Sequence, residues 1–244
     1  MRPGRLIGRG KEAEVFEAGE DVLKLYRAGV GQPVVEREAG ILARLADLPL
    51  PAPQLRGVVE IDGRWGLVMS RAVGQPLAAD LRDDTIEAIA QGTAMLHGRI
   101  HAQPGTGLES YKARLTAAIG QAEGLEAVEQ AGLMQRLAAL PDGDRLCHGD
   151  FHPANIIGSL EHPVIVDWPD ARSGPPAADV GRSYLLLLHN LPAMAEPYLA
   201  GYEQHWGLPR AAVLDWLPVL AAARLAENVP AEAERLLALA RSGL

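Results

Sequence analysis

The chain has 244 residues, of which 48% are hydrophobic and 22% charged, and its formal net charge is −8. This length and composition fit a folded protein with a sizeable core and argue against disorder. The acidic balance disfavours nucleic acid as a partner, and no apolar run approaches the length that spans a bilayer. The single cysteine, Cys147, excludes an internal disulfide, and residues 1–10 lack the apolar segment of a secretory signal, so we expect a cytoplasmic protein.

The charge is unevenly distributed along the chain. Residues 1–70 carry ten acidic and ten basic side chains, whereas residues 71–244 carry 21 acidic and 13 basic ones. An acidic C-terminal part can serve solubility, or it can attract a cationic substrate. Both interpretations stay open.

The first seventy residues predict short strands around one helix. A helix from about Pro33 to Ala46 is favoured because proline suits a first helical turn, and three further prolines prevent its continuation. The dipeptide Asp62-Gly63 predicts a hairpin between the last two strands. The predicted strands contain Leu6-Ile7, Val15-Phe16, Val22–Tyr26, Val58–Ile61 and Trp65–Met69.

Beyond Met69 the pattern becomes helical. Apolar residues at helical spacing predict a long helix over about 84–101, and a helical region over 108–140 that is loosened near Gly120, Gly124 and Gly132. Strands first and helices later predict an α+β arrangement of two lobes: residues 1–70, a connector at 71–75, and a helical lobe at 76–244. The last four predicted helices span about 176–190, 192–206, 209–227 and 230–241.

Lys24 lies in the middle of an apolar strand, in a chain with only three lysines. A buried lysine needs an anionic partner. In the following helix, Glu38 falls in the centre of the apolar stripe, whereas Glu36 faces the opposite side. We therefore predict a Lys24–Glu38 ion pair, which in kinases orients the phosphates of ATP. A simple interior salt bridge is the alternative.

Gly8 and Gly10 stand between two predicted strands, where their backbone N–H groups can approach phosphates closely. The kinase loop G-x-G-x-x-G-x-V has counterparts here in Gly8, Gly10 and Val15, with Ala13 in place of the third glycine. Alone, such a Gly-x-Gly indicates only a turn. No P-loop pattern occurs.

The stretch His148-Gly149-Asp150, with Asn155 five residues after Asp150, keeps the spacing of the kinase catalytic loop H-R-D-x-x-x-x-N. Asp167 follows at the end of an apolar strand. Asp150 can orient an acceptor hydroxyl and take its proton, and the oxygens of Asn155 and Asp167 suit Mg²⁺. His148 is expected to brace the loop through a backbone hydrogen bond.

A metallohydrolase is the rival interpretation of the same stretch. It would use His148, Asp150, His152 and Asp167 as metal ligands. It leaves Asn155, Lys24 and Glu38 unexplained, so a kinase is the preferred hypothesis.

Together these residues resemble the aminoglycoside phosphotransferase and choline kinase-like family of small-molecule kinases, over nearly the whole chain. The segment His148–Asn155 is similar to the family's H-G-D-x-x-x-x-N loop, and Asp167-Trp168 with Gly174-Pro175 is similar to its metal-binding segment. The resemblance implies an α+β, two-lobed protein-kinase-like fold, with a small antiparallel-sheet N-lobe containing one helix and a mainly helical C-lobe.

The resemblance also implies ATP and Mg²⁺ as cofactors and a small-molecule hydroxyl acceptor, with a cationic acceptor left open. Asp179 would steady the C-terminal lobe. The adenine would contact the connector, near Met69, Ser70 and Ala72. Because the glycine loop is incomplete, a nucleotide-binding protein with little or no catalysis is the alternative.

Two further features bear on the acceptor. Pro169 stands where protein kinases have the glycine of D-F-G, and Asp179 follows Asp167 by only twelve positions, so we expect no activation segment and no protein substrate. An aromatic cage for a cationic group is one hypothesis, and a core role for the same aromatics is the other. The candidate cage residues are Tyr184, Tyr202, His205, Trp206 and Trp216.

Overall fold

The computed structural model describes residues 2–244. They form two compact units, each built from two stretches of the chain. The first contains the residues up to 79 together with 154–169, and the second contains 80–153 together with 170–244. The lobes predicted from the sequence, residues 1–70 and 76–244 with a connector at 71–75, remain a prediction.

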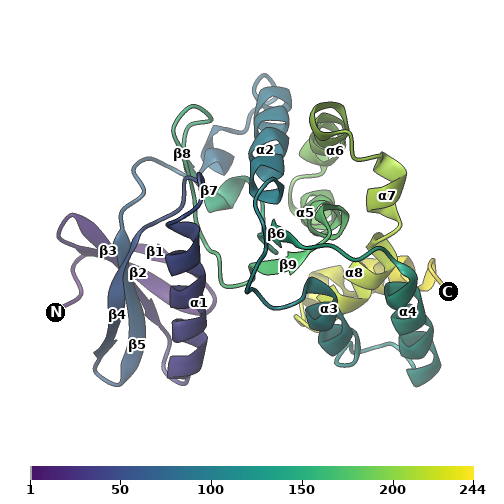
Figure 1. Ribbon diagram of the computed structural model, residues 1–244, viewed down its shortest axis with the longest axis horizontal. Helices are drawn as coiled ribbons and strands as arrows, with labels where there is room; N and C mark the ends of the chain where they lie inside the picture. Colours follow the sequence, from purple (N-terminus) through teal and green to yellow (C-terminus); the bar gives the residue numbers. More distant parts are fainter. Residues whose placement is uncertain (1) are drawn as a thin grey trace. The chain divides into compact units, whose positions relative to one another are not determined.

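An antiparallel sheet forms most of the first unit (Figure 1). Its spatial order is β1-β2-β3-β5-β4, which places β3 in the centre. The predicted hairpin joins β4 and β5, where Asp62 and Gly63 both adopt positive φ, as a two-residue turn of this type requires. The strands are β1 (Leu6–Arg9), β2 (Ala13–Ala18), β3 (Asp21–Tyr26), β4 (Leu55–Ile61) and β5 (Arg64–Ser70).

Helix α1 (Gln32–Leu45) packs against β4 and β5. It begins next to Pro33, and its buried stripe includes Glu38, as its helical phase predicted. The other face of the sheet has its own apolar cluster around Leu23 and Leu25. Since side chains alternate along a strand, Lys24 lies between these two leucines but points to the opposite face.

A second, smaller element completes the first unit. Strands β7 (Ile156–Gly158) and β8 (Pro163–Ile165) pair with each other, and a backbone bond of 2.9 Å runs from the Gly158 N–H to the Gln75 carbonyl. Single-turn 3-10 helices cover Leu77–Asp80 (η1) and Pro153–Asn155 (η2). The chain that follows η2 is therefore anchored to the end of the connector.

The second unit is mainly helical, as predicted. Helix α2 packs along α6, and α8 contacts both α3 and α9 (Figure 1). The elements are α2 (Ile86–His101), α3 (Tyr111–Ile119), α4 (Ala127–Ala139), β6 (Arg145–Cys147), β9 (Arg172–Gly174), α5 (Pro176–Asn190), α6 (Pro192–Trp206), α7 (Arg210–Leu214), α8 (Leu217–Leu225), η3 (Pro230–Glu232) and α9 (Ala233–Arg241).

Two details of the helix predictions were wrong. The helix predicted over 209–227 is divided into α7 and α8. Pro218 favours a new helix start there, because proline has no N–H and residues of a first turn need none for the helix. Gly132 does not loosen its helix and lies inside α4, whereas Gly120 and Gly124 do separate α3 from α4.

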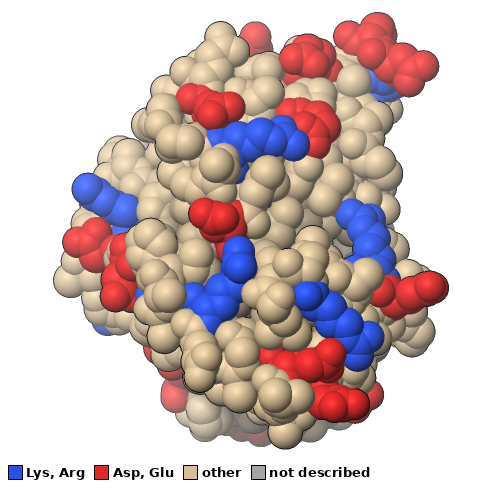
Figure 2. All heavy atoms as spheres, turned by 90° about the vertical axis from the view of Figure 1, so that its right-hand side faces the viewer, with Lys and Arg blue, Asp and Glu red and all other residues tan. Residues whose placement is uncertain are grey.

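Charged side chains of both signs lie beside one another on the face that Figure 2 shows. Ion pairs such as Arg210–Glu196 at 2.5 Å and Arg241–Glu129 at 2.7 Å neutralise acidic groups locally. Within residues 2–244, the structure has no helix that is both long enough and apolar enough to cross a membrane.

Candidate active site

Lys24 occupies the central strand of the sheet, with Val15 and Leu67 as its neighbours on the adjacent strands. Its ammonium group donates to both carboxylate oxygens of Glu38, at 2.8 and 3.0 Å. Glu38 is only 2% exposed. The ion pair predicted from strand position and helical phase is thus present.

Tyr26 is a third member of this cluster that the sequence analysis missed. Its hydroxyl donates to Glu38, and burial together with the Glu38 charge raises the pKa of Tyr26. The signal was available, since Tyr26 lies two residues after Lys24 and so shares its face of the strand. Glu38 therefore holds two strand residues at once.

Asp167 contacts the same ammonium group. Its Oδ1 lies 2.9 Å from Lys24 Nζ, and the Asp167 side chain is 46% exposed. Burial lowers the pKa of Lys24, but the Glu38 and Asp167 charges outweigh this effect and raise it, so the ammonium stays charged. Lys24 thus joins a buried carboxylate to a half-exposed one.

Asn155 and Asp167 meet at one end of the β7–β8 pair. Ile156 pairs with Ile165, and the Val166 N–H donates to the Asn155 carbonyl at 2.9 Å. Asp167 adopts a left-handed φ of 65°, which aspartate tolerates better than most residues. Oxygen ligands of this kind suit Mg²⁺, so these two residues fit the predicted metal role.

The glycine loop connects β1 and β2. A Cβ atom at Gly8 or Gly10 would meet its nearest neighbour at 3.5 Å, an ordinary contact, and neither glycine has a positive φ, so the fold itself requires neither. Ala13, in place of a third glycine, is buried at the start of β2. The Arg27 guanidinium fixes the loop by donating to the Gly10 and Lys11 carbonyls.

The three predicted adenine contacts lie at the end of β5 and just beyond it. Met69 is buried, and the Ser70 hydroxyl accepts a hydrogen bond from the Gln54 N–H at 2.8 Å. Ala72 follows in the connector and is half-buried. Their role with a nucleotide stays a prediction.

Asp150 belongs to the second unit and is 30% exposed. His152 Nε2 lies 3.6 Å and Arg182 Nη2 3.9 Å from its carboxylate. Burial would raise the pKa of Asp150, but the contact with His152 and the charge of Arg182 lower it to about 2. Asp150 is therefore ionised at neutral pH. No pattern in the sequence pointed to Arg182.

The buried carboxylate of Asp179 holds the loop around Asp150 through backbone hydrogen bonds. The backbone N–H groups of His148 and Gly149 donate to its carboxylate at 2.6 and 2.8 Å. His148 is fully buried, and its Nδ1 accepts from the Asp150 N–H at 3.2 Å, the kind of backbone hydrogen bond expected of it. Gly149 has a φ of 84°, and a Cβ there would lie 2.4 Å from the Asp170 carbonyl oxygen, so this position requires glycine.

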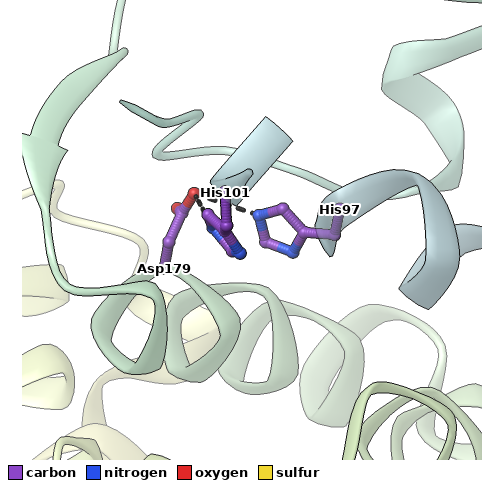
Figure 3. A group of neighbouring side chains, drawn as sticks. All are labelled: His97, His101 and Asp179. Atoms are coloured by element: carbon purple, nitrogen blue, oxygen red, sulfur yellow. Dashed lines mark hydrogen bonds and ion pairs between the residues drawn. The ribbon is translucent and has the colours of Figure 1, made fainter. Parts of the chain in front are cut away.

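Two buried histidines of α2 also bond to Asp179 (Figure 3). His97 Nε2 and His101 Nε2 lie 3.0 and 3.1 Å from Asp179 Oδ2, while their Nδ1 atoms lie 2.6 Å from the hydroxyls of Tyr198 and Tyr202. Burial and the neighbouring His101 lower the pKa of His97 to about 3, so it is neutral. Its Nε2–H therefore donates to the carboxylate, and its Nδ1 accepts from the tyrosine.

Among the described residues, His97, His101 and Asp179 are the group of histidine and acidic side chains whose ligand atoms all lie within 4.8 Å of one another. A cation there would have to replace both Nε2 protons, and Asp179 Oδ2 also accepts from the backbone of His148. Four N–H donors already satisfy this carboxylate, and the histidines hold the pKa of Asp179 well below its usual range despite burial. The cluster is a hydrogen-bond network.

The predicted cage residues separate into core and surface. Trp216, Tyr184 and Tyr202 are buried, whereas Trp206 is 42% exposed and His205 is exposed beside it. Tyr184 donates to Glu196, and Tyr202 bonds to His101. The core interpretation therefore holds for the three buried aromatics.

The fold, the Lys24–Glu38 pair and the braced loop around Asp150 are features expected of a kinase-like phosphotransferase. A family model described as "Phosphotransferase enzyme family" matches residues 4–214. The chain belongs to this family, which confirms the family resemblance and the enzyme class, a small-molecule kinase, predicted from the catalytic stretch.

Solved structures show the same fold. Aminoglycoside phosphotransferase APH(4)-Ia has a TM-score of 0.72 at 17% identity, covering 98% of this chain and 93% of that one. The choline kinase LicA from Streptococcus pneumoniae has a TM-score of 0.66 at 16% identity, covering 100% and 93%. The streptomycin–ATP–APH(2")-IIa ternary complex has a TM-score of 0.63 at 17% identity, covering 96% and 89%. No curated protein sequence matches the chain.

Proposed function

We propose that this chain transfers the γ-phosphate of ATP, with Mg²⁺, to a hydroxyl group of a small molecule, and that Asp150 is the base. The observation that carries the proposal is the double contact of Lys24. Its ammonium group joins Glu38, which fixes it, to Asp167, the predicted metal ligand. An interior salt bridge without a ligand needs no half-exposed second carboxylate.

Lys24 would bind the α- and β-phosphates of the nucleotide. In the structure its donors are taken by Glu38 and Asp167, so a phosphate would take the place of Asp167. The two loop glycines leave space for phosphates, and the fold itself does not require them. One similar structure, the APH(2")-IIa complex, contains ATP and streptomycin, which supports ATP as the donor.

Asn155 and Asp167 would hold the metal ion. Their position at one end of the β7–β8 pair offers two hard oxygen ligands, and Mg²⁺ completes its coordination with waters and phosphate oxygens. When bound, the ion neutralises charge on the phosphates. Asn155 and Asp167 would thereby position the phosphates of ATP.

Asp150 would accept a hydrogen bond from the acceptor hydroxyl and orient its oxygen toward the γ-phosphorus. As the oxygen–phosphorus bond forms and the bond to the ADP oxygen breaks, the hydroxyl proton passes to the Asp150 carboxylate and later to solvent. A carboxylate with a pKa of about 2 is a weak base. Its main contribution is therefore orientation, with proton transfer late in the reaction.

The acceptor would be a small molecule. Eleven residues link Asp167 to Asp179, and β9 occupies three of them, which leaves no segment able to hold a peptide. The similar structures include aminoglycoside phosphotransferases and a choline kinase, and their descriptions name small molecules rather than proteins as ligands.

The test is ADP release by the purified chain across a panel of hydroxyl compounds, compared with Asp150→Ala. The variant should bind ATP with Mg²⁺ as the wild type does and lose about 10²–10⁴-fold in kcat. Asp144→Ala, at a 93% exposed position outside the loop, is the matched control and should keep full activity. Full activity in Asp150→Ala would refute the assigned role, and ATP binding without ADP release by any acceptor would favour the non-catalytic alternative.

A further inference from the structure

A small pocket of about 50 Å³, partly open to solvent, lies beside the catalytic loop of the second unit. Gly149, next to Asp150, forms part of its wall. Its apolar lining comes from Tyr111 and Leu115 of α3 and Leu220 of α8, all of them buried. The pocket has room for one small polar group of a ligand, and its open side leaves the rest of the ligand outside it.

Three arginines line the same pocket. Arg182 forms ion pairs with two carboxylates: its Nη2 lies 2.7 Å from Glu227 and 3.9 Å from Asp150. Arg172 is only 2% exposed, and its Nε lies 3.5 Å from the exposed carboxylate of Glu109. Each of these two guanidinium groups thus already has a carboxylate of the chain beside it, as a buried cation requires.

Arg114 differs from the other two. Its side chain is exposed on α3, and the structure shows it no ion pair or side-chain hydrogen bond within residues 2–244. Glu227, one of the two acidic residues of the lining, already contacts both Arg182 and Arg224. With Asp170 as the other, the lining carries three positive and two negative charges.

We propose that this pocket binds the acceptor through an anionic group, a carboxylate or a phosphate ester, that pairs with the Arg114 guanidinium while the acceptor hydroxyl faces Asp150. The proposal rests on the phosphotransfer function above and names its substrate class. Arginine presents a planar fork of donors that matches both kinds of oxyanion. A polycationic acceptor would instead meet three guanidinium groups at the wall.

The experiment uses the full chain with ATP and Mg²⁺ and a panel of small alcohols in matched sets. Each set keeps one carbon skeleton and carries a carboxylate, a phosphate ester, a neutral amide or an ammonium group. ADP release above the acceptor-free rate should be confined to the carboxylate or phosphate members. The member with the faster ADP release identifies the preferred anionic group. Arg114→Ala should raise KM for that member about tenfold or more, with little change in kcat.

Arg99→Ala is the matched control, because Arg99 is exposed on α2 and lies outside the pocket lining. Arg114→Lys should restore part of the affinity. Where no member is turned over, calorimetric titration of the same panel against the chain with ADP and Mg²⁺ gives the binding preference.

Preference for ammonium members, an unchanged KM in Arg114→Ala, or no binding of any anionic member at about 10 mM would overturn the proposal. A failure of the phosphotransfer function itself has a different result. ATP would then remain unhydrolysed with every compound, although the anionic members could still bind through Arg114.

Discussion

Each of the two units contains a cluster built around a buried carboxylate, and the two clusters differ in their partners. In the first unit, Glu38 faces the charged Lys24, which also contacts the half-exposed Asp167. In the second, Asp179 is satisfied by two histidines and two backbone N–H groups. A carboxylate surrounded by donors that the fold fixes has one arrangement, whereas a cation shared with an exposed carboxylate can change partners. The first cluster suits a ligand site, and the second suits a rigid support.

The largest expected effect comes from breaking the rigid cluster. Asp179→Ala would leave four buried donors without their acceptor, and we expect a loss of about 3–5 kcal/mol in the free energy of unfolding. Urea denaturation followed by circular dichroism measures this loss. Asp142→Ala, at an 89% exposed side chain, is the control and should be close to neutral. A loss below about 1 kcal/mol in Asp179→Ala would show that the network does not support the fold.

Breaking the ligand cluster should affect activity more than stability. Glu38→Gln removes the charge that fixes Lys24, so kcat/KM for ATP should fall about 10–100-fold. Glu36→Gln is the matched control, because Glu36 is exposed on the same helix and bonds to Gln32, away from the cluster. Equal kinetics for the two variants would argue against the role of Glu38.

The two clusters were not equally predictable from the sequence. Lys24 and Glu38 could be paired because each stands at a position, mid-strand or mid-stripe, where a charge is costly without a partner. His97 and His101 could not be paired with Asp179 in this way, because they lie 82 and 78 positions from it in the sequence. A histidine on an apolar helix face does not indicate which residue it will contact. The strands and most helices were predictable because periodicity, proline and glycine act over a few neighbouring residues, and the catalytic loop was predictable from its residue spacing. The pocket arginines come from α3, α5 and β9, so only the packed structure brings them together.

The second cluster also predicts a dependence of stability on pH. The pKa of His97 is lowered to about 3 in the folded chain, so below the ordinary value near 6.5 the unfolded chain binds a proton that the folded chain does not. The stabilisation is therefore complete above pH 6.5 and is lost as the pH falls, by about 1.4 kcal/mol per unit. Urea midpoints between pH 7.5 and 5 test this slope. His97→Gln should be less stable but show a shallower dependence, and an unchanged slope would contradict the assignment.

The smallest effect concerns the hydroxyl shared by the first cluster. Tyr26→Phe removes one donor to Glu38 and leaves Lys24 in place, so we expect a loss of about 0.5–1.5 kcal/mol in stability and a modest rise in KM for ATP. Differential scanning calorimetry and steady-state kinetics give the two values. Tyr184→Phe, which breaks a bond to Glu196 in the second unit, is the control and should leave KM for ATP unchanged. The same KM in both variants would exclude Tyr26 from the ligand cluster.

The measurement that tests the central claim most directly is calorimetric binding of ATP, with and without Mg²⁺, to the wild type, Asp167→Ala and Asp150→Ala. If Lys24 and Asp167 form a nucleotide and metal site, Mg²⁺ should strengthen ATP binding to the wild type and to Asp150→Ala, and this gain should disappear in Asp167→Ala. An equal gain from Mg²⁺ in Asp167→Ala, or no ATP binding to any of the three proteins, would contradict the account.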